Sequence, residues 1–226
     1  IKSDTSGVEF TNTNYVASFD SDGFTLNNDG DINDNNATYA SWNWKANGAG
    51  SANTDGSINS TVSVNTTAGF SIVKFTANGT NNGTIGHGLG VAPKVVLYKR
   101  TDSTGSWYWL YKYVDGSLDF LQLDSTAAKT DLTLGTYGFT TSTTFTNLGL
   151  GNGQEIIAYC FAEKKGYSKF GSYTGNGNAD GTFVYTGFKP AFILHKRTDN
   201  TSGWDLFDNK RLGYNVANRL LAPNNS

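Results

Sequence analysis

Residues 94–102 read Lys94-Val95-Val96-Leu97-Tyr98-Lys99-Arg100-Thr101-Asp102, a nearly continuous apolar run between two lysines that ends in a polar cluster. β-branched and aromatic residues favour strands, and an apolar run without polar alternation suits a strand that is covered on both faces. The stretch therefore predicts a central strand of a sheet. The next segment, 106–113, places Trp107 and Trp109 two residues apart, so they would share one face of a second strand.

The same stretch belongs to an internal repeat. The repeated unit contains a strand that ends in an Asn-Gly turn, a proline before the apolar strand, the Lys-Arg-Thr-Asp end of that strand, and a tryptophan. The matched segments are 75–79 with 173–177, Pro93 with Pro190, 99–102 with 196–199, and Trp107 with Trp204. The offset is 98 from residue 75 to 173 and 97 from 107 to 204, so the register is kept with a single net deletion. Such self-similarity indicates a modular architecture.

A looser match relates the beginning of the chain to the end of the complete module. Asp22-Gly23-Phe24-Thr25 resembles Tyr137-Gly138-Phe139-Thr140, and Ser41-Trp42-Asn43-Trp44 resembles Ala158-Tyr159-Cys160-Phe161. We therefore predict four parts in the chain. They are the back half of a module at 1–48, a linker at 49–69, a complete module at 70–166, and the front half of a further module at 167–226.

The predicted linker is rich in Gly, Ser, Asn and Thr, which is typical of flexible connections. The two half modules would leave strand edges unpaired, and such edges readily pair with another chain. We therefore expect the front half, 171–226, and the back half, 1–46, to complete each other, either within one chain or between neighbouring copies. Because the module boundaries do not fall at the chain ends, the chain is expected to be a piece of a longer protein.

Strand and turn chemistry runs through the whole sequence. Short apolar and aromatic segments alternate with clusters of Gly, Asn, Thr and Ser, and hydrophobic residues make up 37% of the chain, which is enough for a core. No segment keeps an apolar period of 3.6 residues with caps, so little helix is expected. The predicted fold class is all-β, with repeated antiparallel β-sandwich modules of a jelly-roll-like kind.

Charge and cysteine content exclude several classes of protein. Charged residues make up 16% of the chain and the net charge is -2, so there is no basic field for nucleic acid or an anionic membrane. No apolar run approaches the roughly 18 residues that are needed to cross a bilayer. Cys160 is the single cysteine, so an extracellular protein of this sequence would depend on packing and on assembly with copies of itself rather than on disulfides.

Five strings carry a family resemblance: 19–26, 86–94, 158–166, 170–177 and 187–192. The second of them reads Gly86-His87-Gly88-Leu89-Gly90-Val91-Ala92-Pro93-Lys94. These strings resemble a repeat in virion proteins of marine tailed phages, of the cyanophage and pelagiphage type. In that family the repeat occurs in large structural or tail-fibre-like proteins, often beside concanavalin-like lectin domains. The resemblance implies a virion location and a non-catalytic role.

The sequence contains no recognisable catalytic constellation. His87 lies in a Gly-rich turn and His195 in a predicted strand, and neither has the spacing of a nucleophile elbow or a metal site. Paired carboxylates for glycan cleavage remain a separate possibility, and their separation would decide it. The candidates are Asp102, Asp115, Asp119 and Asp124. Surface acids are far commoner than catalytic pairs, so we assign no catalytic residue and expect a protein that is not an enzyme.

An oxygen-rich loop at 27–36 is the best candidate for a metal site, with Asp29, Asp31 and Asp34 as possible Ca²⁺ ligands. The position of the bidentate glutamate of a calcium loop is occupied by Ala40, so coordination would be incomplete. Asn, Asp and Gly are also the residues that turns require. We favour the turn interpretation and expect no metal or cofactor.

Carbohydrate binding is the main candidate for a ligand site. Sugar sites combine an aromatic wall with a few polar groups. The residues that could form one are Trp107, Trp109 and Trp204, with Asp102 and Asp199 nearby. The alternative is that these tryptophans belong to the core of every module, because indoles are largely buried wherever they occur. Exposed tryptophans around a concavity would favour a lectin, and buried ones would favour a purely structural role.

These observations predict a phage virion protein at the particle surface or otherwise extracellular. We expect a tail-fibre or appendage component that attaches to host surface polysaccharide and assembles with its own copies or with other virion proteins, without nucleic acid or membrane insertion. One alternative is a capsid or tail decoration protein without a ligand. A polysaccharide depolymerase is a third.

Overall fold

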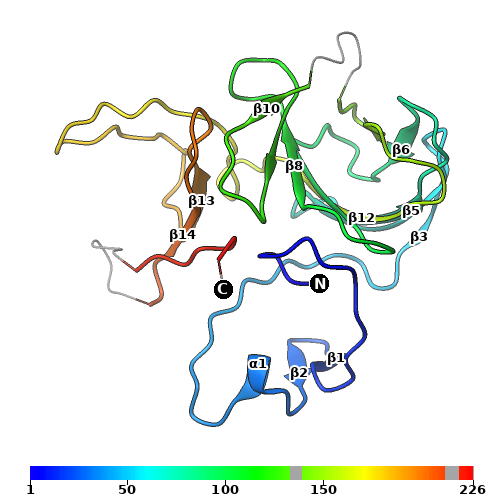
Figure 1. The fold of residues 1–226 in the computed structure, drawn as a ribbon, viewed down its shortest axis with the longest axis horizontal. Coiled ribbons are helices and arrows are strands. Elements are labelled where there is room, and N and C mark those ends of the chain that lie inside the picture. The colour runs from blue at the N-terminus through cyan, green and yellow to red at the C-terminus, as the bar shows by residue number, and fades with distance from the viewer. Residues whose placement is uncertain (133–138, 212–218, 226) are drawn as a thin grey trace. The chain divides into compact units, whose positions relative to one another are not determined.

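The computed structural model describes residues 1–132, 139–211 and 219–225, and the chain is divided into two compact units. The larger unit comprises Ile1–Val8 and Lys45–Ser226, and the smaller unit comprises Glu9–Trp44. Each is described by itself. The protein is nearly all β, as the sequence predicts, and the described residues contain one short helix (Figure 1). None of those residues forms a helix with the length and apolarity to cross a bilayer.

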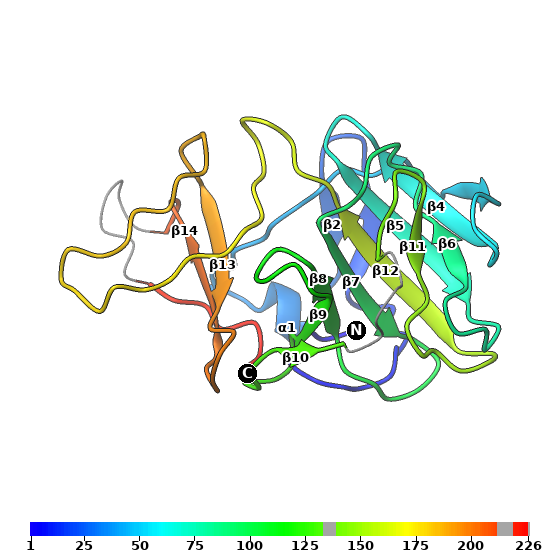
Figure 2. The same ribbon diagram turned by 90° about the horizontal axis from the view of Figure 1, so that it is seen from above.

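An eight-stranded antiparallel sheet is the centre of the larger unit, with the strand order β10-β9-β8-β7-β12-β5-β4-β3 (Figure 2). Its strands are β3 (Ser51–Asn53), β4 (Ser60–Asn65), β5 (Phe70–Thr76), β7 (Val95–Arg100), β8 (Tyr108–Tyr111), β9 (Asp119–Gln122), β10 (Thr130–Asp131) and β12 (Glu155–Phe161). The predicted central strand is confirmed. β7 lies between β8 and β12, and both Val95 and Val96 are fully buried although they point to opposite faces.

Each face of this sheet is covered by a two-stranded sheet. On one face lie β6 (Thr84–Gly86) and β11 (Thr144–Thr146), whose Ile85 and Phe145 pack into a core with Val73 and Ile156. Against the other face lie β13 (Phe192–Lys196) and β14 (Trp204–Asp208), whose Trp204 belongs to a second core with aromatic residues of β8. The alternation of side chains along each central strand thus supplies two cores. This arrangement is the sandwich that the composition predicts.

The predicted linker at 49–69 is wrong. This stretch contributes β3 and β4 to the large sheet, and Ile58 and Val62 from it are buried in the first core. Ile58 also forms a parallel bridge to Ile85, and its amide donates to the carbonyl of Thr84 at 2.9 Å. A few well-placed apolar residues are sufficient here, because threonine and serine suit strands, and β4 lies between β5 and the short edge strand β3. Polar composition alone therefore did not mark a linker.

The internal repeat is visible as two hairpins with the same register. In the complete module Val95 pairs with Tyr111 and Tyr98 with Tyr108, whereas in the third module Phe192 pairs with Asp208 and His195 with Asp205. Every one of these positions moves by 97 residues. The segment 220–222 continues the correspondence, because Leu221 bridges Leu206 as Leu121 pairs with Trp109. Other parts of the third module differ, since 182–184, which correspond to β6 at an offset of 98, form no strand.

The smaller unit contains a hairpin and one turn of helix. β1 (Val16–Phe19) pairs with β2 (Phe24–Leu26), and α1 (Gly30–Asn33) follows with Asp29 as its N-cap. The Asp29 side chain accepts from the amide of Asp31 at 2.9 Å, which satisfies one of the donors at the start of the helix. Phe19 and Phe24 are exposed in this unit. An isolated two-stranded hairpin with exposed aromatic residues is marginally stable by itself.

Replacement of Ile58 tests whether residues 49–69 belong to the core. We expect Ile58→Ala to lower the free energy of unfolding by about 2–4 kcal/mol, because it removes a buried branched side chain and leaves a cavity. Thr61→Ala, at an exposed position of β4, is the matched control and should change stability little. Urea unfolding followed by tryptophan fluorescence measures both. Equal stability of the two variants would contradict the assignment of this stretch to the core.

Candidate functional site

The structure brings Trp107, Trp109 and Trp204 together, but in a core rather than on an open wall. Trp107 is 7% exposed and Trp204 is 2% exposed. The rings of Trp109 and Trp204 lie 5.5 Å apart between centroids, and the half-buried Trp109 donates its indole N–H to the hydroxyl of Tyr113 at 3.3 Å. The rings are tilted by 53° to each other. Burial of Trp107 and Trp204 favours the alternative that these tryptophans belong to the core, because buried rings offer no exposed face to a pyranose.

The two aspartates of the predicted site pair with arginines of their own loops. Asp102 accepts from Nε and from a terminal nitrogen of Arg100 at 2.8 and 3.0 Å, and Asp199 accepts from the same nitrogens of Arg197 at 2.7 and 3.2 Å. The guanidinium holds the pKa of each carboxyl below its usual value. The Lys-Arg-Thr-Asp string thus builds a turn that is closed by a bidentate ion pair, and it does so in both modules.

The indole N–H groups of the repeated tryptophans show what holds the hairpins in place. Trp107 donates to the carbonyl of Lys2 at 2.9 Å, and the amide of Gly105 donates to the carbonyl of Ser6 at 2.9 Å. Residues 2–6 are thereby docked against the loop that joins β7 to β8. A buried indole requires a partner for its N–H group, and a segment from outside the module supplies it.

The third module repeats this arrangement. Trp204 donates to the carbonyl of Gln122 at 2.8 Å, and the amide of Ser202 donates to the carbonyl of Thr126 at 2.9 Å. Both donors lie 97 residues after those of the first pair, and both acceptors lie 120 residues after theirs. One docking geometry, which we call the indole junction, therefore occurs twice, at 2–6 on β7–β8 and at 122–126 on β13–β14.

Sequence reasoning did not find the acceptor side of the junction. A signal was present, because Asp4-Thr5-Ser6 resembles Asp124-Ser125-Thr126. The match is three small polar residues long, and such residues are abundant throughout this chain. Only the pairing of backbone carbonyls with the tryptophans identifies it as part of the repeat.

A buried lysine completes the first copy of the junction. Lys99 is fully buried, and its ammonium donates to the carbonyls of Ser6, Arg100 and Gly105 at 3.2, 3.1 and 2.7 Å. Removal from water lowers the pKa of Lys99. Its counterpart Lys196 donates to the carbonyl of Arg197 at 2.7 Å, and burial likewise lowers the pKa of Lys196. Because one of the three acceptors is the Ser6 carbonyl, the ammonium of Lys99 also holds the docked segment against the end of β7.

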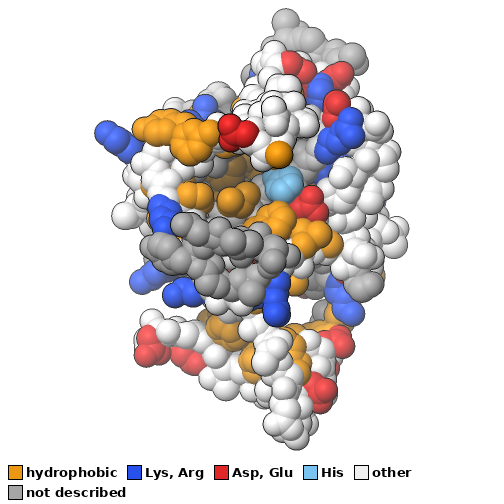
Figure 3. Space-filling model, turned by 90° about the vertical axis from the view of Figure 1, so that its left-hand side faces the viewer, with side chains coloured by type: hydrophobic (Ala, Val, Ile, Leu, Met, Phe, Trp, Pro, Cys, Tyr) orange, Lys and Arg blue, Asp and Glu red, His pale blue; other side chains and the backbone are white. Residues whose placement is uncertain are grey.

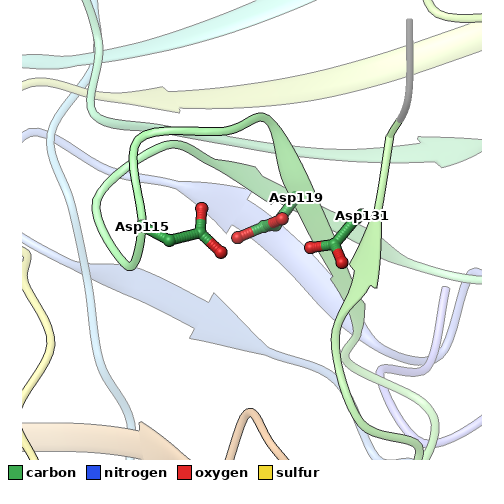
Figure 4. Close-up of side chains that lie close together, drawn as sticks. All are labelled: Asp115, Asp119 and Asp131. Atoms are coloured by element: carbon green, nitrogen blue, oxygen red, sulfur yellow. The ribbon is translucent and has the colours of Figure 1, made fainter.

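Three carboxylates converge at one end of the sheet, on the turn before β9 and on β9 and β10 (Figure 4). One oxygen from each of Asp115, Asp119 and Asp131 lies within 4.8 Å of the others. The ammonium of Lys129 contacts all three, at 2.9 Å from Asp115 and 3.2 Å from Asp119. The convergence predicted for Asp115 and Asp119 is therefore found.

The other two acids of that prediction lie elsewhere, since Asp102 pairs with Arg100 and Asp124 accepts from the amide of Trp107 at 3.1 Å. The sequence did not predict that Asp131 belongs to this cluster. Asp131 lies on the two-residue strand β10, which pairs with β9 across a loop. No pattern in the sequence marks so short a strand.

Burial and the shared lysine set the charges of this acidic cluster. Burial raises the pKa of Asp119, which is fully buried, whereas Lys129 lowers the pKa of Asp115 and of Asp131. Two buried oxygens nearby, Oδ2 of Asp119 and the hydroxyl of Tyr111, have no hydrogen-bond partner. Because the ammonium of Lys129 already lies among the carboxylates, it takes the position in which a divalent cation would bind. The arrangement is that of an ion-pair network.

The predicted metal loop at 27–36 uses its acids for local structure. Asp29 caps α1 and also accepts from the side-chain amide of Asn12 at 2.9 Å. Asp31 accepts from the hydroxyl of Tyr15 at 2.8 Å, which raises the pKa of that phenol, and Asp34 accepts from the amide of Asn35. The cap by Asp29 and the Asp34–Asn35 bond are the local contacts that the turn interpretation predicts. The bonds from Asn12 and Tyr15 join the loop to the preceding segment.

Both histidines have structural partners. His87 is fully buried, and its Nδ1 accepts from the amide of Leu89 at 3.1 Å while Nε2 lies 3.2 Å from the carbonyl of Thr141. Burial lowers the pKa of His87, so the ring is held neutral. His195 lies 3.2 Å from Asp205 across the β13–β14 hairpin. These contacts stabilise a turn and a strand pair.

A cleft of about 370 Å³ opens beside β7 and β8, on the face opposite the tryptophans. Its lining includes Tyr98, Arg100, Ser106, Tyr108, Phe120 and Gln154. Tyr108 stacks on Tyr98 with centroids 5.2 Å apart and meets Phe120 edge to face at 5.3 Å. An aromatic floor beside guanidinium, amide and hydroxyl groups is the combination expected of a small polar ligand site.

The family model that matches this chain covers residues 1–226 and is described as a domain of unknown function, DUF7483. The chain belongs to the DUF7483 family. No curated protein and no solved structure matches it. The indole junction, the acidic cluster and the cleft are therefore features of a DUF7483 domain that rest on the geometry of this chain.

The acidic cluster predicts a specific dependence of stability on pH. Burial raises the folded-state pKa of Asp119 above its unfolded value, so its contribution to stability is fully present below the unfolded pKa and is lost as pH rises through the folded pKa. Asp119→Asn keeps a donor toward Asp131 and removes the charge. We expect the variant to gain stability relative to the natural protein as pH is raised from 4 to 8.

Urea unfolding at a series of pH values measures this difference. Asp22→Asn, which removes an exposed acid, is the control and should give no such trend. A difference between Asp119→Asn and the natural protein that stays constant over this range would contradict the raised pKa of Asp119.

The indole junction predicts a local change in protection. Trp204→Phe removes the N–H group that bonds Gln122 and reduces the buried area, which costs about 1–3 kcal/mol. The effect should appear as faster amide hydrogen exchange in peptides covering 192–208, with little change in β12. Tyr167→Phe, at an exposed position, is the control. Unchanged exchange in 192–208 would show that the junction does not hold the hairpin.

Proposed function

We propose that this DUF7483 chain is a non-enzymatic structural repeat protein of a tailed-phage particle, displayed at the particle surface. The observation that carries the proposal is the indole junction. A contact that joins one module to a different surface of the next, and then occurs again with the same donors and acceptors, is a head-to-tail contact. Contacts of this kind generate rings or open arrays.

Three further features support an architectural role. Trp107 and Trp204 are buried and form junctions inside the molecule, and Asp102 and Asp199 close turns. The acidic residues near β9 share the ammonium of Lys129. The single cysteine is buried and burial raises its pKa to about 12, so the fold is held by packing and hydrogen bonds. The resemblance of five strings to marine phage virion repeats supplies the location in this proposal, and copies of the chain or other virion proteins are its partners.

Attachment to a host glycan is the second candidate, and the cleft beside β7 and β8 favours it. The half-buried ring of Tyr108 and the polar groups of Arg100, Ser106 and Gln154 could receive one sugar unit. A depolymerase has less support. Hydrolysis requires two carboxyl groups that reach the substrate, whereas Asp119 is fully buried and its neighbours are paired with Lys129.

Immunogold labelling of purified phage particles tests the location. Antibodies raised against the recombinant chain should label a fixed part of the particle, either tail fibres or capsid surface, in a marine tailed phage that encodes it. Particles of a phage without the gene are the control. Antigen that remains in the soluble fraction of the lysate, with unlabelled particles, would overturn the proposal.

A variant that fills the cleft tests glycan binding without disturbing the core. Ser106→Trp places a large side chain in the cleft lining, and Ser103→Trp on the same loop lies outside it. If the cleft binds sugar, labelled chain should bind host envelope polysaccharide saturably, and Ser106→Trp should lower the affinity at least tenfold, equivalent to about 1.4 kcal/mol. Equal polysaccharide binding by both variants, or no binding by the folded natural chain, would contradict a sugar site in the cleft and favour the purely structural role.

A further inference from the structure

The third module contains a strand edge that the complete module fills. In the complete module β12 lies between β7 and β5, and it pairs with both along their length. β13 is the counterpart of β7, but among the described residues it pairs with β14 alone. The edge of β13 that corresponds to the β12 side of β7 is therefore open.

Aromatic side chains of the third module are exposed although their counterparts in the complete module form the core. Tyr173 corresponds to Phe75 at an offset of 98 and is 55% exposed, whereas Phe75 is 4% exposed. Phe183 corresponds in the same way to Ile85 and is 85% exposed, whereas Ile85 is fully buried. Figure 3 shows hydrophobic side chains gathered on the side of the molecule that carries β13. A soluble protein rarely leaves so much of an intended core uncovered without a partner.

The chain also contains a second segment with the sequence character of β12. Ser41-Trp42-Asn43-Trp44 matches Ala158-Tyr159-Cys160-Phe161 of β12 at an offset of 117, and Tyr39 corresponds to the buried Ile156. Residues 38–44 form no strand in the structure, and Tyr39 and Trp44 are exposed. One copy of the protein thus carries both a β12-like segment outside any sheet and an edge that lacks a β12-like strand.

We propose that residues 38–44 of one copy add to the edge of β13 in a second copy as an antiparallel strand. The pairing of β12 with β7 fixes the register, because Ala158 lies opposite Tyr98 and Phe161 opposite Val95. Transferred to the open edge, Ser41 lies opposite His195 and Trp44 opposite Phe192. Added strands of this kind gain main-chain hydrogen bonds and bury alternate side chains.

A second copy is the occupant because every copy carries one donor segment, 38–44, and one acceptor edge, on β13. Among the residues that the structure describes, neither is used in a sheet for this pairing. A donor and an acceptor that are different parts of the chain make a heterologous contact, which propagates from copy to copy. This inference rests on the proposed assembly from copies of the chain, and it names the strand and the edge that would join them.

Disulfide trapping between two singly substituted chains tests the register. Two variants are prepared as separate proteins, Ser41→Cys and, at its predicted partner position, His195→Cys. They are mixed under mild oxidation. Residues directly opposite in an antiparallel pair have Cα atoms about 4.5–5.5 Å apart, within the range for a disulfide. We expect a linked dimer on a non-reducing gel. The native Cys160 does not interfere, because it is buried and its pKa is raised to about 12.

The matched control is Lys196→Cys in place of His195→Cys. A shift of one residue moves the side chain to the other face of the strand, so this pair should remain unlinked. Linkage of both pairs to the same extent, or an intrachain disulfide in a double variant without linkage of the mixed single variants, would overturn the proposal.

Sedimentation provides a second readout that does not depend on cysteine chemistry. Ala40→Pro removes a main-chain donor that faces β13 in the proposed register, in a segment that belongs to no sheet of the single copy. Its counterpart Ile157 pairs with Lys99, and the bond from the Thr101 amide to the Glu155 carbonyl shows that alternate residues of β12 from Glu155 onward face β7. The natural chain should form larger species as its concentration rises, and Ala40→Pro should remain a monomer. Larger species that persist in Ala40→Pro would refute strand addition and leave the proposed assembly intact, whereas a monomeric natural chain would count against both. Particle labelling tests the virion location independently of either result.

Discussion

The structure depends on the hydrogen bond from a buried indole to a carbonyl outside its own hairpin. Trp107 and Trp204 contribute large apolar areas to one core, and that burial requires a partner for each N–H group. In both hairpins the partner is a carbonyl from another part of the chain, that of Lys2 or that of Gln122. The requirement of a single donor thus joins each hairpin to a segment outside it.

Much of the fold could be predicted because burial on two faces leaves a clear pattern. Val95-Val96-Leu97-Tyr98 has no polar alternation, and it is the covered strand β7. The repeat was readable for the same reason, and the hairpins share their register at every pair. Residues 49–69 were misjudged because β4 and the short edge strand β3 contain few apolar residues, and Ile58 and Val62 were enough to join this stretch to the core.

The candidate site was less predictable, since a sequence does not state whether an aromatic residue faces solvent. The sequence correctly grouped three tryptophans, Trp107, Trp109 and Trp204, but it did not show that they pack in a core. A tryptophan is equally suited to contact a sugar and to contact another indole. Asp115 and Asp119 were expected to converge, but Asp131 and Lys129 were not, since they reach the cluster through a two-residue strand. The cleft at Tyr108 arises from side chains of separate strands and has no local signature.

The third module shows how one sequence pattern leads to two outcomes. Phe75 and Tyr173 occupy equivalent positions, yet one is buried and the other exposed. The difference lies in β12, since this strand joins β5 to β7 in the complete module, and no described strand takes the same place beside β13. Apolar positions become a core only when a strand closes the sheet above which they lie. A hairpin that is already docked through Trp204 loses little further entropy when such a strand arrives, because its acceptor edge is held in the conformation of β7. The indole junction therefore lowers the entropic cost of the proposed strand addition.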